Sequence, residues 1–355
     1  MNDCLQQIRE FAGRVGRDVT FMEVCGTHTM AVSRSGLRDL LPANVKLISG
    51  PGCPVCVTDT NYLDAAIELA RRPGVIIATF GDLVRVPGSE SSLERERAAG
   101  ADVRVVYSPP DALALARQNP HRQVVFLGVG FETTAPTVAW TIKQAAAEIV
   151  ANYSVLCAHK TMPHAMEALL KDQEVKVDGF ICPGHVSVIT GAQIYRFIPE
   201  RYGIPCVVSG FEAGDVLRCV AMLLAQIATG RVEVEVQYTR SVNEHGNPVA
   251  QRWLAEVFEE SAAGWRGIGV IPRSGLAIRA EFAGWDAAQA HHVEFREAKP
   301  HPGCRCGDVL RGVIRPTQCK LFDKACTPSN PFGPCMVSSE GACAAAYKYE
   351  RKEAA

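Results

Sequence analysis

VKLISGPGCPVCVTDTNYLDAAIELARRPGVIIATF, residues 45–80, contains the pattern that decides the fold. Its two ends, 45–49 and 74–80, are short apolar runs that are typical of buried strands. Between them, residues 59–72 have the apolar spacing of a helix. A strand, a helix and a second strand in succession predict parallel strands that are covered by helices.

The same alternation continues on both sides of this stretch. Further strands are expected at 19–24, 102–107, 122–129, 153–158, 177–182 and 204–209. Further helices are expected at 1–15, 109–118, 134–151, 212–229 and 248–260. We therefore predict an α/β protein with two small parallel-sheet lobes that face a cleft, and a third domain rich in cysteine.

The domain boundaries are expected where the pattern changes. Asn119-Pro120-His121 separates a first lobe, 33–119, from a second lobe, 120–230. After Gly230 a half-exposed strand at 232–238 and a Cys-, Pro- and Gly-rich tail follow. The third domain is expected to combine 231–355 with 1–32, so that the N-terminal helix packs against the tail.

Composition excludes several classes of protein. Thirty-seven Lys and Arg residues against 38 Asp and Glu residues give a net charge of −1, without the basic surplus of a nucleic-acid binder. The N-terminus has no apolar core of a secretion signal. The most apolar stretch, 216–229, contains Arg218 and Gln226 and is too short to span a bilayer. A cytoplasmic protein is expected.

Cysteine is over-represented, with 14 residues in a chain of 355. A reducing cytosol argues against a structural disulfide framework, so metal or redox chemistry is the leading hypothesis. Four tail cysteines lie in a loop-rich segment that has little apolar core of its own and needs a cross-link or a metal to hold it together: Cys319, Cys326, Cys335 and Cys343. Four thiolates suit zinc or an iron–sulfur cluster. Structural zinc sites usually have cysteines two to four residues apart, and the wider spacings here favour a cubane iron–sulfur cluster. Cys304 and Cys306 could compete for the ligand positions.

Two further cysteine motifs follow predicted strands. Cys53-Pro54-Val55-Cys56 enters a helix, where the free N–H groups favour a thiolate. Its spacing permits a disulfide, half of a metal site, or two buried thiols. Cys25 and His28 would lie on one side of a helix that begins there. A thiolate and an imidazole are a ligand pair for a transition metal or a nucleophile and its base, although such a pair is more often structural.

Nearly all of the unusual polar residues follow predicted strands, at the edge where α/β proteins bind their ligands. Polar loops are common there, but this collection of thiols, imidazoles and carboxylates favours one shared site. Glu132, His185 and Glu212 are therefore candidates to support a metal at Cys25 from facing loops.

Six segments together resemble the HypD family of [NiFe]-hydrogenase maturation factors: FMEVCGTHTMAV, SGPGCPVCVT, GFETTAPTVAW, CPGHVSVITG, SGFEAGDVL and CKLFDKACTPSNPFGPCMVSSEGACAAAY. They run in order from residue 21 to residue 347. The resemblance implies a cytoplasmic scaffold that binds a small HypC-type partner, accepts cyanide from a HypE-type partner, and assembles the Fe(CN)₂CO unit for the hydrogenase large subunit.

The resemblance also implies roles for individual residues. Cys25 would ligate the iron together with a cysteine of the HypC-type partner, and His28 would be a nearby ligand or proton carrier. Cys53 and Cys56 would be a redox-active dithiol. The four tail cysteines would hold a [4Fe–4S] cluster.

Two other functions remain open from the residues. An iron–sulfur-dependent protein disulfide reductase would use the same cluster and dithiol but would give Cys25 no role. A zinc-stapled nucleotide-binding module would leave the three loop cysteines idle.

Overall fold

The computed structural model describes residues 2–351, and its strands form two parallel sheets and one hairpin. The first sheet has the order β2-β1-β7-β8-β9, with β1 Val19–Glu23, β2 Val45–Ser49, β7 Gly179–Pro183, β8 Cys206–Ser209 and β9 Val234–Val236. The second sheet has the order β4-β3-β5-β6, with β3 Val75–Thr79, β4 Asp102–Val105, β5 Gln123–Gly128 and β6 Tyr153–Cys157. The antiparallel hairpin consists of β10 Phe258–Trp265 and β11 Gly269–Ile278. The predicted α/β fold with two parallel-sheet lobes is confirmed.

Helices cover both sheets, and short helices separated by loops occur in the tail. In the first half of the chain they are α1 Asn2–Val15, α2 Gly26–Arg34, α3 Leu37–Leu40, α4 Pro54–Val57, α5 Thr60–Ala70, α6 Gly81–Val84, α7 Leu93–Ala98, α8 Pro109–Gln118, α9 Ala135–Ala147 and α10 Met162–Lys171. In the second half they are α11 Gly184–Thr190, α12 Phe197–Tyr202, α13 Ala213–Thr229, α14 Pro248–Val257, α15 Ala287–Ala290, α16 Cys306–Leu310, α17 Pro334–Val337 and α18 Ala342–Tyr349. Short 3₁₀ helices span Ala192–Tyr195, Ala280–Trp285 and Pro316–Gln318.

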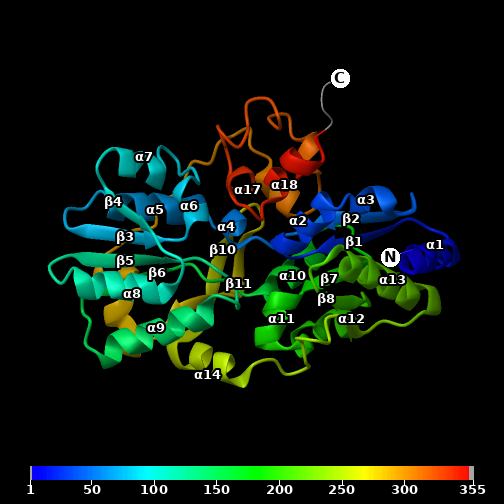
Figure 1. The fold of residues 1–355 in the computed structure, drawn as a ribbon, viewed down its shortest axis with the longest axis horizontal. Coiled ribbons are helices and arrows are strands. Elements are labelled where there is room, and N and C mark those ends of the chain that lie inside the picture. The colour runs from blue at the N-terminus through cyan, green and yellow to red at the C-terminus, as the bar shows by residue number, and fades with distance from the viewer. Residues whose placement is uncertain (1, 352–355) are drawn as a thin grey trace.

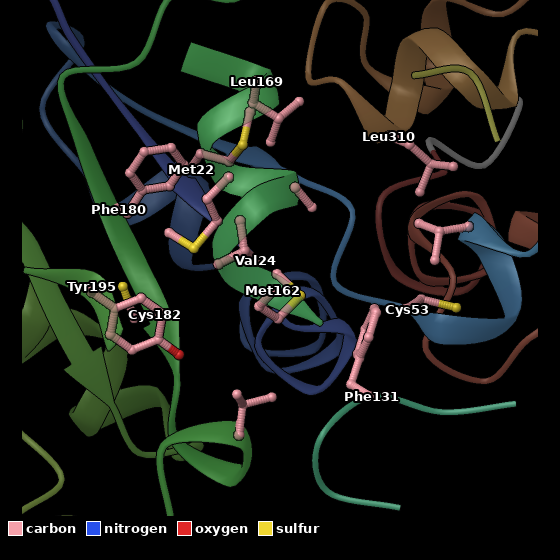
Figure 2. Close-up of a cluster of buried hydrophobic side chains, with 14 of the residues drawn as sticks. Met22, Val24, Cys53, Phe131, Met162, Leu169, Phe180, Cys182, Tyr195 and Leu310 are labelled. Carbon is pink, nitrogen blue, oxygen red and sulfur yellow. The ribbon is translucent and has the colours of Figure 1, made fainter. Parts of the chain in front are cut away.

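The two sheets lie side by side, and the tail helices α17 and α18 lie above the junction between them (Figure 1). Each sheet has apolar clusters of its own, since its strands are buried between helices. A further cluster contains residues of both lobes and the tail, among them Met22, Cys53, Phe131 and Leu310 (Figure 2). Trp265 and Cys306 belong to the same cluster. The lobes and the tail are therefore held together by one shared core.

The sheets do not follow the expected boundary between residues 119 and 120. β3 pairs with β5, so strands on both sides of that boundary share one sheet. Asn119-Pro120-His121 lies in the turn between α8 and β5, and the side-chain amide of Asn152 closes this turn by donating hydrogen bonds to three of its carbonyl oxygens. The expected break is therefore an ordered turn within one lobe.

The expected third domain is also divided differently. α1 packs against α13, and its side chains Ile8 and Ala12 belong to the same apolar cluster as Val216 and Val220. β9 extends the first sheet, and α14 packs on α9 of the second. Only the segment after about residue 300 forms the cysteine-rich part of the structure.

The loops after β1 and β2 touch because these strands pair in register and end together, Glu23 beside Ser49. The backbone N–H of Gly26 donates a hydrogen bond to the carbonyl of Gly52 over 3.0 Å. A Cβ atom on Gly52 would lie 2.1 Å from the backbone nitrogen of Cys25. Glycine is required here because the two backbones are in direct contact.

We predict that Gly52→Ala lowers the free energy of unfolding by about 1–3 kcal/mol, the usual cost of forcing an extra methyl group into a packed site. Gly13→Ala is the matched control, because a Cβ at Gly13 in α1 has no neighbour within 4 Å. Urea titration under anaerobic conditions measures both. Equal stability of the two variants would contradict the contact.

Candidate functional site

Cys25 lies between the end of β1 and the first turn of α2, where it is the N-cap residue. Its side chain is 8% exposed. Burial raises the pKa of its thiol to about 12, and the nearby carboxylates of Glu340 and Glu23 add to this rise. The thiol is therefore protonated at neutral pH, and a metal that binds here must displace that proton.

Two carboxylates beside Cys25 were not among the predicted site residues. Glu23 is fully buried at the end of β1, accepts hydrogen bonds from the N–H of Cys25 and the hydroxyl of Thr29, and has a pKa raised by burial to about 7. Glu340 accepts a hydrogen bond from the hydroxyl of Thr27 over 2.7 Å, and burial raises its pKa as well. Each has a signal in the sequence: Glu23 is a charge in an apolar strand, and Glu340 lies between two tail cysteines.

His28 lies in the first turn of α2, three residues after Cys25. It is fully buried, and its Nε2 lies 2.9 Å from the carbonyl oxygen of Gly210. Burial lowers its pKa to about 4, so the ring is neutral at pH 7. With Nε2–H donating to Gly210, Nδ1 is unprotonated, and it has no hydrogen-bond partner within residues 2–351.

The predicted residue His185 belongs to the surroundings of His28. Phe211 stacks on both rings, at 5.0 Å from His28 and 3.7 Å from His185 between ring centroids. Because β1, β7 and β8 are adjacent in the first sheet, the loops that follow them bring these three residues together.

Cys53 and Cys56 form a disulfide with Cα atoms 5.2 Å apart. Cys53 is the N-cap of α4, and its sulfur accepts a hydrogen bond from the N–H of Cys56. Both residues are buried in the core that the lobes share with the tail, where Phe131 faces the same cluster (Figure 2). The spacing of the motif permitted this pairing.

Residues 338–340 connect the tail to both lobes. The hydroxyl of Ser338 lies 3.4 Å from the sulfur of Cys53 and donates a hydrogen bond to Asp82, which follows β3 of the second sheet. Asp82 also accepts from the backbone and the hydroxyl of Ser339. Glu340 contacts the helix of Cys25. Residues 338–340 therefore contact the disulfide, the helix of Cys25 and Asp82 beside the second sheet.

Six cysteines line one apolar cavity in the tail: Cys304, Cys306, Cys319, Cys326, Cys335 and Cys343. Leu321, Phe322 and Met336 complete its wall. The sulfur atoms of Cys306 and Cys335 are 2.8 Å apart. The pKa of Cys306 lies well below its ordinary value, because the thiols of Cys304 and Cys335 donate hydrogen bonds to it.

This donor set fits an iron–sulfur cluster. A cubane binds one thiolate at each of four corners, and its ligands are therefore farther apart than those of a single ion. In the described part of the chain, no three His, Cys, Asp or Glu side chains converge as the ligands of one metal ion would. The four predicted ligands all line the cavity, and Cys304 and Cys306 line it with them.

Glu132 and Glu212 are placed differently from the other candidates. Glu132 is buried after β5 of the second sheet, where Oε1 accepts from the N–H of Met162 and Oε2 has no partner among the described residues. Glu212 is exposed at the start of α13. Neither makes a hydrogen bond to Cys25 or His28 within residues 2–351, so their supporting role stays a prediction.

Known proteins that resemble this chain do so over nearly its whole length. The profile of the HypD family, described as the hydrogenase formation hypA family, matches residues 1–350. The chain belongs to the HypD family. Hydrogenase maturation factor HypD of Rhodobacter capsulatus is 49% identical over 99% of this chain and 96% of the relative. The proteins of the same name from Cupriavidus necator and Escherichia coli are 48% and 45% identical, over 95% and 98% of this chain and 91% and 95% of the relatives.

Membership of the HypD family confirms the resemblance that the six sequence segments indicated. The matched region contains the Cys25 loop, the Cys53–Cys56 disulfide and all six cysteines of the cavity. Among residues 2–351, no helix combines the length and the apolar character that a membrane span needs.

We predict that Glu132→Gln stabilises the protein at pH 8.5 but not at pH 4.5. Burial raises the pKa of Glu132 to about 7, so the folded chain holds this proton more tightly than the unfolded chain does. The stability that this proton contributes is present at low pH and is lost as pH rises through 7. Ionisation of the buried carboxyl at pH 8.5 costs roughly 3 kcal/mol.

Urea titrations at the two pH values measure the effect. Glu297→Gln is the control, because Glu297 is exposed. An equal change in the free energy of unfolding at both pH values would contradict the raised pKa of the Glu132 carboxyl group.

Proposed function

We propose that this chain is a hydrogenase maturation scaffold on which the Fe(CN)₂CO unit of the [NiFe] site is assembled. The observation that carries the proposal is the connection of three kinds of cysteine site by residues 335–343. This segment begins and ends at two cysteines of the tail cavity, lies against Cys53 through Ser338, and contacts the helix of Cys25 through Glu340. A site that binds iron, moves electrons and transfers cyanide needs these parts close together.

In this proposal Cys25 ligates the iron to be modified, together with a cysteine of a HypC-type partner. A soft thiolate suits iron that also binds diatomic ligands. The proton of the Cys25 thiol must leave, and Glu23, in contact with the N–H of Cys25 and with a pKa of about 7, is placed to receive it. His28 presents the unprotonated Nδ1 of a neutral ring, as required of a ligand or proton carrier.

The reduced form of Cys53 and Cys56 supplies electrons for cyanide transfer. Release of cyanide from a thiocyanate on a HypE-type partner takes two electrons and one proton, and yields a thiol and cyanide. Oxidation of the dithiol to the disulfide releases two electrons and two protons, so the two reactions balance with one proton left over. Ser338 is placed to accept a hydrogen bond from the Cys53 thiol in the reduced state.

Cys319, Cys326, Cys335 and Cys343 are proposed to hold a [4Fe–4S] cluster. When bound, such a cluster supplies electrons one at a time. Three of the six cysteines that line the cavity, Cys306, Cys326 and Cys335, are buried, and Cys306 and Cys335 belong to the core that contains the disulfide.

A protein disulfide reductase is the second candidate, because the disulfide lies in the same core as cavity cysteines. It gives no role to Cys25 or to the carboxylates around it. The two functions are separated by whether the chain retains iron beyond that of a cluster.

We predict that the anaerobically purified protein is brown and contains about four irons per chain from the cluster. Cys335→Ala should lose the colour and Cys304→Ala should keep it. Absorption spectra and iron analysis measure both variants, with Cys4→Ala, far from the cavity in α1, as the control. Loss of the cluster in Cys304→Ala and its retention in Cys335→Ala would contradict the assignment of the four ligands.

We predict that Cys25→Ala removes the iron that is not part of the cluster. The cluster should remain, since Cys25 does not line the tail cavity. Iron is counted in the complex purified anaerobically with the HypC-type partner. Cys219→Ala, at a buried free cysteine in α13, is the matched control. An unchanged iron count in Cys25→Ala would show that the scaffold holds its iron elsewhere.

A further inference from the structure

The hairpin β10–β11 inserts its tip between the disulfide helix α4 and the first helix of the cysteine-rich tail, α16. Trp265, the last residue of β10, is fully buried in the core that also contains Cys53 and Cys306. Gly267 lies so close to Gly307 that a Cβ on Gly267 would be 2.1 Å from the Cα of Gly307. The hairpin tip is therefore fixed against the residue that follows Cys306.

Arg266 lies between Trp265 and Gly267 in the hairpin tip and binds the end of α4. Its backbone N–H donates to the carbonyl of Val57 over 3.0 Å, and its Nε donates to the carbonyl of Thr58 over 3.1 Å. Both carbonyls lie at the C-terminal end of the helix that carries Cys56, an end that favours a positive charge. These bonds hold the guanidinium group beside the disulfide helix.

One N–H group of the Arg266 guanidinium lacks a hydrogen-bond partner among the described residues. Nη2 of Arg266 is buried and makes no hydrogen bond with any described residue. The positive charge of Arg266 favours the ionised forms of the Cys306 thiol and of the Asp59 carboxyl group. A cavity of about 960 Å³ is lined by Arg266, Asp59, Cys304 and Cys306 together. A buried N–H donor without an acceptor is costly, so an acceptor at this place is expected.

We propose that Arg266 sets the reduction potential of the tail cluster by its positive charge. Gly267 beside it lies against Gly307, and Cys306 next to Gly307 has its sulfur 2.8 Å from that of the proposed ligand Cys335. This inference rests on the proposed cluster. Thiolate and cluster sulfur atoms accept hydrogen bonds, and both nearby charge and such bonds shift the potential. Arg266 also holds α4, so one side chain joins the environment of the cluster to the helix of the disulfide.

The signs of two substitutions follow from charge alone. Reduction adds a negative charge to the cluster, and a nearby positive charge stabilises the reduced form and raises the potential. Arg266→Gln removes that charge and should lower the potential. Asp59→Asn removes the negative charge that opposes Arg266 and should raise it. Asp59 precedes α5 without capping it through its side chain, so asparagine leaves the helix start in place.

The test is a potentiometric titration of the anaerobic full-length protein at pH 8, followed by electron paramagnetic resonance of the reduced cluster. We expect Arg266→Gln to weaken reduction at least tenfold, a fall of 59 mV for a one-electron couple. Asp59→Asn should shift the midpoint upward. Arg273→Gln is the matched control on the same hairpin, because Arg273 is exposed and pairs with Glu260.

Each outcome decides the inference. An unchanged midpoint in Arg266→Gln, or a shift equal to that of Arg273→Gln, would overturn it while the cluster itself stands. If Arg266→Gln fails to retain the cluster, the midpoint potential of Asp59→Asn decides. The inference is overturned if that midpoint does not shift upward. Unsubstituted protein without iron in the tail would instead contradict the proposed cluster.

Discussion

The hydroxyl of Ser338 is the contact on which the rest of the arrangement depends. It donates a hydrogen bond to Asp82, which follows β3 of the second sheet, and it lies against the sulfur of Cys53, which follows β2 of the first sheet. It also accepts a hydrogen bond from the N–H of Glu340. Through it the tail is held where the two lobes meet, as Figure 1 shows for α17 and α18. Since α18 also packs on α2, the helix after Cys25 is fixed by the same segment. Cysteines from three parts of the chain are in this way kept within one core.

Burial shifts the pKa values of Cys25, His28, Glu23 and Glu132 in the direction that favours the neutral form of each group. The thiol of Cys25, with a pKa of about 12, is protonated, and His28, with a pKa of about 4, is not. Glu23 and Glu132 have pKa values near 7 for the same reason. In the proposed scaffold, a metal that binds at Cys25 displaces the proton of its thiol, and Glu23 already contacts the backbone N–H of that residue.

The sequence predicted the elements well and their assembly less well. Residues 45–80 correctly predicted two strands and a helix, because apolar periodicity reports burial. They did not reveal that β2 and β3 belong to different sheets, because pairing depends on contacts between strands distant in sequence. In the same way, Asn119-Pro120-His121 has the composition of a linker, and only the bonds of Asn152 identify it as an ordered turn. The spacing of Cys53 and Cys56 permitted a disulfide as one of several arrangements, whereas Glu340 and Arg266 reach their sites through tertiary contacts alone.

We propose that Cys25 holds iron while the metal receives its diatomic ligands. This is tested by the infrared spectrum of the full-length protein, purified anaerobically together with its HypC-type partner. We expect bands of iron-bound cyanide and carbon monoxide in this complex. A complex that carries its cluster and its partner but shows no such bands would contradict this proposal.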